Sequence, residues 1–253
     1  MLIESITINR RDFDAAIFDL DGVLTNSARV HAAAWKVVFD AFLQRWAQRR
    51  GLAFQPFDIE ADYLTYVDGR PRYDGVRSFL ADRGINLPEG SEQDPEDANT
   101  VHALGERKTR LFRQALQKGM DPAAGAEALL KKLREVGIRT AVGSSSKNAK
   151  AILHAAGLEH HVDVRVDGID ADALGLPGKP DPALFVEAAH RLGVQPPRTI
   201  LFEDALAGVE AGERGGFGCV VGIDRGQQGE TLRQRGADVV IKDLREVKVE
   251  ETL

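Results

Sequence analysis

The chain has 253 residues, of which 43% are hydrophobic and 28% charged, a composition typical of a globular protein. Its 33 basic and 39 acidic side chains give a net charge of −6. This charge argues against a nucleic-acid-binding protein, because such proteins need a basic surface to displace counterions. Nowhere do about 18 apolar residues run together, so we expect no membrane-spanning segment.

The single cysteine, Cys219, leaves no internal disulfide and no cysteine-based zinc site, which favours a reducing compartment. The first ten residues contain no long apolar stretch, so no signal peptide is predicted. A cytoplasmic enzyme is the class that these features favour, although they leave a scaffold protein open.

Short apolar runs, stopped by turn or acidic residues, alternate with helical segments at the start and in the second half of the chain. This alternation predicts an α/β fold with a parallel sheet covered by helices on both faces. Ligands of such sheets bind beyond the carboxyl ends of the strands. The predicted strands are 15–18, 139–142, 199–202, 219–221 and 238–241, and the predicted helices are 124–136, 147–156, 182–192, 205–214 and 229–235.

Residues 29–118 interrupt the alternation and are predicted to be all-helical. We therefore expect two domains: a catalytic core of residues 1–28 and 119–253, and an inserted helical cap, 29–118, acting as a lid over the strand ends. The acidic loop 88–97 is predicted to be a solvated connection rather than a metal site, because its carboxylates lack a metal-ligand spacing. The predicted cap helices are 28–50, 58–67, 74–83 and 98–118.

The long helix 28–50 carries an apolar stripe of Trp35, Phe39, Phe42 and Trp46 at helical spacing. Such a stripe is more often the core of a domain than a dimer interface. We therefore expect a monomer.

The first predicted strand ends in two carboxylates, Asp19 and Asp21, followed by Gly22. A turn at the glycine lets both face one point. Asp19 could attack a phosphorus atom as a nucleophile, and Asp21 could move the proton of the entering or leaving oxygen. Capping of a helix by both acids is the alternative.

Two further strand–helix junctions carry groups that bind anions. The second strand is followed by Ser144, Ser145, Ser146 and, after one lysine, Asn148, whose hydroxyls and backbone N–H groups could hold a phosphate. Lys179 lies on a loop stiffened by two prolines, where a lysine loses less entropy when it meets a phosphate. Taken alone, each of these motifs could simply cap a helix.

The strand 199–202 ends in Glu203 and Asp204. Their carboxylates, opposite Asp19 and Asp21, suit Mg²⁺, which prefers a few carboxylates together with waters and phosphate oxygens. Four converging acids would repel one another, and a divalent metal with Lys179 would offset that repulsion. We therefore predict a Mg²⁺ site formed by Asp19, Asp21, Glu203 and Asp204.

These four ordered motifs resemble those of the haloacid dehalogenase superfamily of phosphotransferases. The resemblance implies a Rossmann-like parallel-sheet core with Mg²⁺ as cofactor, and an insert after the first motif resembles the helical cap of that superfamily. The opening from Asp21 to Trp35, with His31, is similar to that of its β-phosphoglucomutase subgroup. The resemblance implies Asp19 as nucleophile, Asp21 as acid and base, and His31 as an assisting catalytic residue.

The same resemblance extends into the cap. Gly69 and Arg72 match a cap loop of the subgroup whose arginine holds the distal phosphate, while Ser144, Ser145, Ser146, Asn148 and Lys179 match phosphate-binding positions. Asp68 stands where the subgroup has a lysine, and Arg70 could supply the missing positive charge.

The function that the resemblance implies is phosphoryl transfer through a phospho-aspartate, interconverting β-D-glucose 1-phosphate and glucose 6-phosphate by way of glucose 1,6-bisphosphate. A sugar-phosphate phosphatase of the same superfamily is the alternative, in which water replaces the second hydroxyl. A non-catalytic sugar-phosphate sensor is a more remote one, since it would tolerate the loss of Asp19 or Asp21.

Overall fold

The computed structural model describes residues 6–226 and 228–250, and the chain divides into two compact units. The core unit comprises Met1–Ser27 and Met120–Leu253, and the helical unit comprises Ala28–Gly119. The first five residues of the segment analysed for a signal peptide lie outside the described residues. Among those that are described, no helix has the length and apolar character needed to cross a membrane.

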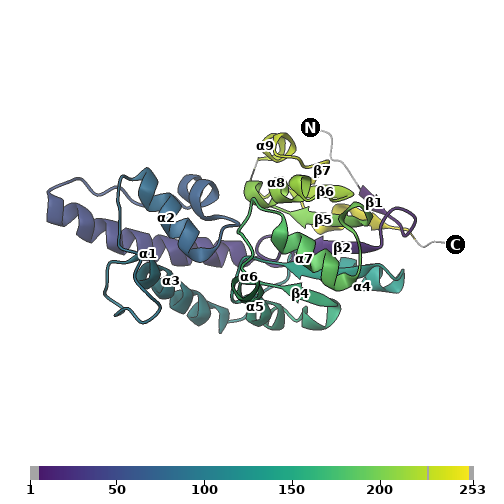
Figure 1. Cartoon of the computed structure of the whole chain (residues 1–253), viewed down its shortest axis with the longest axis horizontal. Coiled ribbons are helices and arrows are strands. Elements are labelled where there is room, and N and C mark those ends of the chain that lie inside the picture. Colours follow the sequence, from purple (N-terminus) through teal and green to yellow (C-terminus); the bar gives the residue numbers. More distant parts are fainter. Residues whose placement is uncertain (1–5, 227, 251–253) are drawn as a thin grey trace. The chain divides into compact units, whose positions relative to one another are not determined.

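The core unit contains a sheet of six parallel strands in the order β4-β3-β2-β5-β6-β7 (Figure 1). Its central strand β2 pairs with β3 on one side and β5 on the other, with Phe18 opposite both Val142 and Phe202. These three strands therefore end at the same level. The strands are β2 (Ala15–Phe18), β3 (Arg139–Gly143), β4 (Val164–Val166), β5 (Thr199–Glu203), β6 (Cys219–Ile223) and β7 (Val239–Ile241); β1 (Ile6–Ile8) and β8 (Val247–Val249) form a separate parallel pair.

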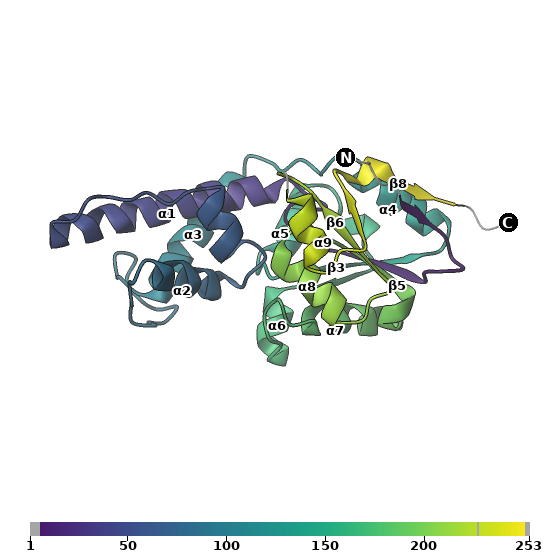
Figure 2. The same ribbon diagram turned by 90° about the horizontal axis from the view of Figure 1, so that it is seen from above.

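Helices cover both faces of this sheet, and Figure 2 shows α4 and α7 on opposite sides of the strands. Phe185 and Ala188 of α7 pack against Ile17 and Ala141 in the apolar core of one face. The helices are α4 (Ala126–Glu135), α5 (Ala149–Ala155), α6 (Gly168–Leu174), α7 (Ala183–Leu192), α8 (Leu206–Arg214) and α9 (Gly229–Gln234).

The five predicted strands and five predicted core helices are confirmed, with each bound matched or shifted by at most two residues. The sequence analysis missed β1, β4, β8 and α6. The three strands have three residues each, and two of them carry a basic residue at the centre, Arg165 or Lys248. Runs this short and polar give no recognisable strand pattern.

The helical unit consists of α1 (Ser27–Arg50), a π-helix (Tyr63–Val67), α2 (Arg72–Asp82) and α3 (Val101–Leu116). Phe39 lies at the centre of its core. Its ring centroid is 4.4 Å from that of Phe79 and 4.8 Å from that of Trp35. The predicted apolar stripe of α1 is therefore part of a domain core. Residues 88–97 contain no helix or strand, in agreement with the predicted connection.

Candidate active site

Asp19 and Glu203 leave adjacent strands of the core sheet at the same level. The backbone N–H of Asp19 donates to the carbonyl of Phe202 at 2.9 Å, which continues the pairing of β2 with β5 by one residue. The parallel ladder thus brings together two carboxylates that are 184 positions apart in the sequence.

Lys179 lies between these two carboxylates. Its Nζ is 2.6 Å from Asp19 Oδ1 and 2.5 Å from Glu203 Oε1, and its side chain has no exposed surface. Burial favours the neutral amine, but the two carboxylates outweigh burial and raise the pKa of Lys179, so the ammonium is retained. The lysine that the sequence analysis selected on a loop is therefore the counter-charge of the buried centre.

The carboxylate of Asp19 is held through both oxygens. Oδ1 contacts Lys179, and Oδ2 accepts the backbone N–H of Asp21 at 2.8 Å. Burial raises the pKa of Asp19 to about 7; Lys179 opposes this shift, whereas the charges of Glu203 and Asp21 add to it. A buried carboxylate in a fixed orientation beside a cation has the geometry that a nucleophile for a phosphate ester requires.

Glu203 is enclosed by protein donors. Its Oε2 accepts the backbone N–H groups of Asp204 and Ala205, both at 2.6 Å, and its Oε1 accepts from Lys179. Gly208 on α8 makes room for this carboxylate, because a Cβ there would lie 1.7 Å from Oε1. Both oxygens of Glu203 are thus already engaged, and their clearest effect is to hold Lys179 in place.

Asp204 lies against the loop that follows Asp19. A Cβ on Gly22 would lie 2.0 Å from Asp204 Oδ2, and Gly22 has φ +103°, so only glycine suits this turn. Asp204 forms an ion pair with Arg225, which follows β6. The sequence analysis missed Arg225, although the strand-end rule that selected the other residues applies equally to the residues after Cys219–Ile223.

The four predicted Mg²⁺ ligands, Asp19, Asp21, Glu203 and Asp204, all lie at or just beyond the ends of β2 and β5. In residues 6–226 and 228–250, no group of three or more His, Cys, Asp or Glu side chains could hold a metal ion. Asp204 nevertheless lies against the loop that follows Asp19, and Mg²⁺ is commonly held by one or two carboxylates with waters and substrate phosphate. The side chain of Asp21 accepts a hydrogen bond from Ser27 Oγ, which orients it without neutralising it.

The serine motif after β3 forms a hydrogen-bonded turn. Ser144 Oγ accepts the N–H of Ser146 at 3.1 Å, and Ser146 Oγ accepts the N–H of Asn148 at 3.2 Å. Ser144 and Asn148 are buried, and Ser145 lies between them. Because β3 pairs with β2, this turn leaves the sheet beside Asp19.

His31 belongs to the helical unit, where its ring stacks on Phe112 with a centroid distance of 3.9 Å. Its Nδ1 contacts Nζ of Lys108, a buried lysine that lies 5.2 Å from both the Trp35 and Phe112 ring centroids. The sequence analysis missed Lys108. Its position in the apolar series Leu104, Lys108, Phe112 of α3 was the available signal, because a lysine at a core position needs a partner.

Gly69 and Arg72 lie at the start of α2 in the helical unit. Gly69 has φ +70°, and Arg72 is the first residue of the helix, with a side chain that is 15% exposed. Asp68 is buried and its backbone N–H donates to Tyr63, while Arg70 is half-buried.

A family model for haloacid dehalogenase-like hydrolases matches residues 13–216. The chain belongs to this family, as its four motifs indicated. A β-phosphoglucomutase of Mycobacterium bovis is 47% identical over 92% of this chain and 90% of its own length.

Two further matches carry different names. The validoxylamine A 7′-phosphate phosphatase of Streptomyces hygroscopicus is 30% identical over 93% of this chain and 96% of its own. The crystal structure of a β-phosphoglucomutase from Clostridium difficile covers 92% of both chains with a TM-score of 0.72 at 24% identity.

Proposed function

We propose that this protein is a β-phosphoglucomutase, which interconverts β-D-glucose 1-phosphate and glucose 6-phosphate. The observation that carries the proposal is the buried centre in which Lys179 bridges Asp19 and Glu203 at the edge of the sheet. The 47% identity to a β-phosphoglucomutase over most of both chains supports this choice of reaction.

Asp19 is the nucleophile. In the resting enzyme Asp19 carries a phosphoryl group, which it gives to a hydroxyl of the bound sugar monophosphate. The P–O bond to Asp19 breaks as the bond to the sugar forms. The bisphosphate then turns over, and an Asp19 carboxylate oxygen attacks the other phosphorus and releases the product. The hydrogen bond from the Asp21 N–H fixes the oxygen that is not attacking.

Asp21 is the acid and base. It accepts the proton of the attacking sugar hydroxyl and returns it to the leaving oxygen in the reverse half of the cycle. Ser27 Oγ donates to its carboxylate and so supports the side chain in one orientation.

Lys179 stabilises negative charge on the transferring phosphoryl group, and Glu203 holds its ammonium in place. We propose Mg²⁺ as the cofactor, with Asp19 and Asp204 as its side-chain ligands. When bound, Mg²⁺ would neutralise charge on the phosphoryl oxygens. In this proposal Asp21 and Glu203, part of the predicted ligand set, take other roles: Asp21 is the acid and base, and Glu203 holds Lys179.

The remaining predicted residues bind the substrate. Ser144, Ser145, Ser146 and Asn148 form a turn that offers hydroxyl and amide groups to the reacting phosphate. Gly69 and Arg72 belong to the cap loop, and Arg72 holds the phosphate that is not reacting, since a guanidinium suits bidentate phosphate contacts. His31, fixed by Lys108, assists the transfer, and exclusion of water protects phospho-Asp19 from hydrolysis.

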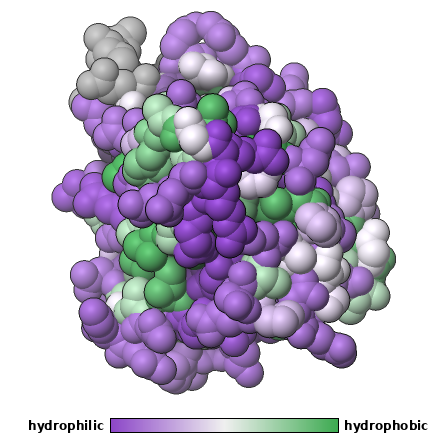
Figure 3. All heavy atoms as spheres, turned by 90° about the vertical axis from the view of Figure 1, so that its left-hand side faces the viewer, coloured by the Kyte–Doolittle hydropathy of each residue, from purple (hydrophilic) through white to green (hydrophobic). Residues whose placement is uncertain are grey.

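We further propose that the protein works as a cytoplasmic monomer on small sugar phosphates, without nucleic-acid or membrane partners. The composition and the acidic net charge support this. The face in Figure 3 is mostly hydrophilic, with apolar side chains in separate small groups rather than one large patch.

A sugar-phosphate phosphatase is the second candidate. Asp68 supports it, because the lysine of the mutase subgroup is absent there, and a phosphatase is among the relatives that match nearly the whole chain. The two candidates share Asp19, Asp21 and Lys179 and differ in whether water reaches phospho-Asp19.

The test is an incubation with β-glucose 1-phosphate, Mg²⁺ and a trace of the bisphosphate, with glucose 6-phosphate and free phosphate recorded separately. Fast formation of glucose 6-phosphate with little free phosphate is expected. Free phosphate that keeps pace would instead identify a phosphatase, and the absence of both products would point to a sensor or another sugar.

A further inference from the structure

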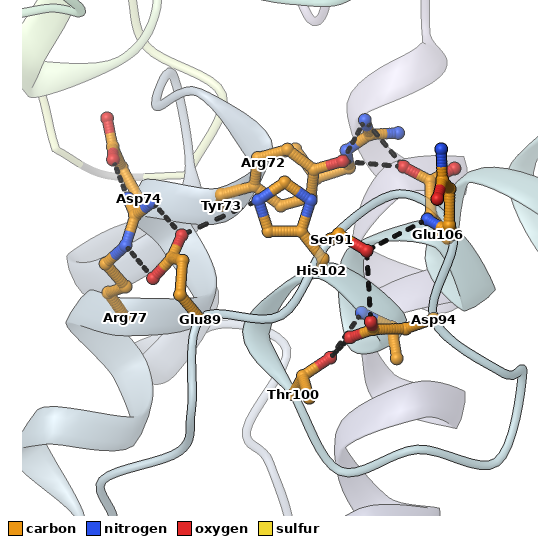
Figure 4. Close-up of polar contacts among 12 residues, drawn as sticks. Arg72, Tyr73, Asp74, Arg77, Glu89, Ser91, Asp94, Thr100, His102 and Glu106 are labelled. Carbon is orange, nitrogen blue, oxygen red and sulfur yellow. Dashed lines mark hydrogen bonds and ion pairs between the residues drawn. The ribbon is translucent and has the colours of Figure 1, made fainter.

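Arg72 is surrounded by side chains of its own unit that the sequence analysis did not select. Its Nη2 donates to the Tyr73 hydroxyl at 2.8 Å and lies 2.8 Å from Glu106 Oε1. The Tyr73 hydroxyl in turn donates to the same Glu106 oxygen at 2.7 Å, which closes a triangle of three polar groups (Figure 4). Two different helices, α2 and α3, therefore hold one guanidinium.

The opposite end of the guanidinium is also fixed. Its Nη1 donates to Thr109 Oγ1, whose own hydroxyl donates to the carbonyl of Gly105 at 3.0 Å. The guanidinium carbon lies 4.5 Å from the centroid of the Tyr73 ring, and that ring stacks on His102 at 3.9 Å. Polar groups thus hold the guanidinium of Arg72 at its edge, and the Tyr73 ring holds it on its face. These contacts leave the side chain little freedom to rotate.

The arrangement depends on a close approach of the two helices. A Cβ on residue 105 would lie 2.7 Å from Tyr73 Cε1 and 3.1 Å from Arg72 Cγ, so glycine there permits the contact. Burial, together with the hydrogen bond to Glu106, raises the pKa of Tyr73, so its hydroxyl remains a donor.

The guanidinium still has donors to offer. Arginine has five N–H groups; two of them donate to Thr109 and Tyr73, and Nη2 also forms the ion pair with Glu106. The Nε–H is buried and finds no acceptor among the residues that the structure describes. The guanidinium is therefore oriented in advance but not saturated with acceptors.

We propose that Tyr73 and Glu106 are positioning residues for Arg72 and set the affinity for substrates that carry a phosphate which does not react. The inference rests on the proposed function, in which Arg72 holds the non-reacting phosphate. Pre-orientation lowers the side-chain entropy lost on binding, so its loss raises KM for such substrates and leaves the chemical step at Asp19 unchanged.

The experiment compares two substrates across matched variants. The first is β-glucose 1-phosphate with Mg²⁺ and the bisphosphate, in which a phosphate that does not react must be held. The second is 4-nitrophenyl phosphate, which has none and reports phosphoryl transfer to Asp19 alone. The variants are Tyr73→Phe, Glu106→Ala and Glu106→Gln, with Arg72→Gln as reference and Glu96→Ala as control, because Glu96 forms an exposed ion pair with Arg110 in the same unit.

We expect Tyr73→Phe and Glu106→Ala to raise KM for the glucose substrate about tenfold, with kcat changed less than about twofold. Glu106→Gln should recover most of the loss, since an amide oxygen accepts the same two hydrogen bonds. Turnover of 4-nitrophenyl phosphate should stay at the wild-type rate in the Tyr73 and Glu106 variants, and Glu96→Ala should match wild type with both substrates.

Three results would overturn the inference. A parallel loss with both substrates would mean that the variants merely damage the fold. An unchanged KM in Tyr73→Phe and Glu106→Ala, with a raised KM in Arg72→Gln, would reject the positioning role and leave the proposed function standing. An unchanged KM in Arg72→Gln would reject the inference together with the phosphate-binding role of Arg72.

Discussion

Among single residues, Lys179 affects both the chemistry of the site and the stability of the core unit. Its ammonium is fully buried between Asp19 and Glu203, so it is both the charge that a phosphoryl group would meet and the charge that makes burial of two carboxylates tolerable. A side chain with both roles couples the chemistry of the site to the stability of the core unit.

Replacing this lysine should therefore destabilise the protein as well as inactivate it. Lys179→Met leaves two buried carboxylates without a counter-charge, and we expect a loss of about 3–5 kcal/mol in the free energy of unfolding. Denaturant unfolding monitored by circular dichroism measures it. A second replacement, Glu203→Gln in the Lys179→Met background, removes one of the two charges and should restore part of the loss.

The destabilisation should also depend on pH in a defined direction. Burial already raises the pKa of Asp19 to about 7, and removing Lys179 takes away the charge that opposes this shift. A raised carboxyl pKa means that the folded state binds more protons than the unfolded state above the ordinary carboxyl pKa, so stability falls as pH rises through that window. The gap between wild type and Lys179→Met should be larger at about pH 8 than at about pH 5, and an equal gap would contradict the assignment.

Asp19 allows the chemistry to be separated from the fold. Asp19→Asn keeps an oxygen that can accept the Asp21 N–H but removes the proposed nucleophile, so we expect both mutase and phosphatase rates to fall by on the order of 10⁴ or more. The melting temperature should move little, because the neutral amide avoids the burial of a charge. Activity that survives this change would refute the assignment of Asp19 as the nucleophile.

At the scale of elements, the packing of α2 on α3 limits what Gly105 can become. Alanine is the better helix former by about 1 kcal/mol, but its Cβ would come within 2.7 Å of the Tyr73 ring. Overpacking costs about 1–3 kcal/mol, so Gly105→Ala should leave the protein unchanged or destabilise it by up to about 2 kcal/mol, while raising KM for glucose 1-phosphate. Kinetics and denaturant midpoints measure the two effects.

Gly75→Ala in α2 is the matched control. An added Cβ there would lie 3.3 Å from a Val67 methyl group, a contact that a small side-chain shift relieves, and it touches neither Arg72 nor Tyr73. We expect a smaller change in stability and no change in KM. Equal effects of the two alanines on KM would argue that the helix contact does not orient Arg72.

The helices and strands that could be predicted from the sequence are those whose own residues carry the pattern. The strand Ala15–Phe18 is apolar throughout and ends at an acid, so its type and bounds could be predicted from its own residues. The strand Val164–Val166 could not, because a parallel partner, β3, stabilises it around a half-exposed Arg165. Likewise the motifs identified Asp19, Lys179 and Glu203 as candidates, whereas the pairing of Glu203 with Lys179 depends on the sheet register and on the space left by Gly208.

At the scale of the whole molecule, ligand binding to the native state should appear as stability. Native-state binding at about 100 times Kd adds about 2.7 kcal/mol, so Mg²⁺ with inorganic phosphate should raise the melting temperature above that measured with a chelator. Asp204→Asn should lose this gain, because it removes one of the two proposed carboxylate ligands. Glu230→Gln, an exposed change on α9, should retain it. A gain that persists unchanged in Asp204→Asn would show that the metal binds elsewhere, and it would remove the reason for placing Mg²⁺ between the ends of β2 and β5.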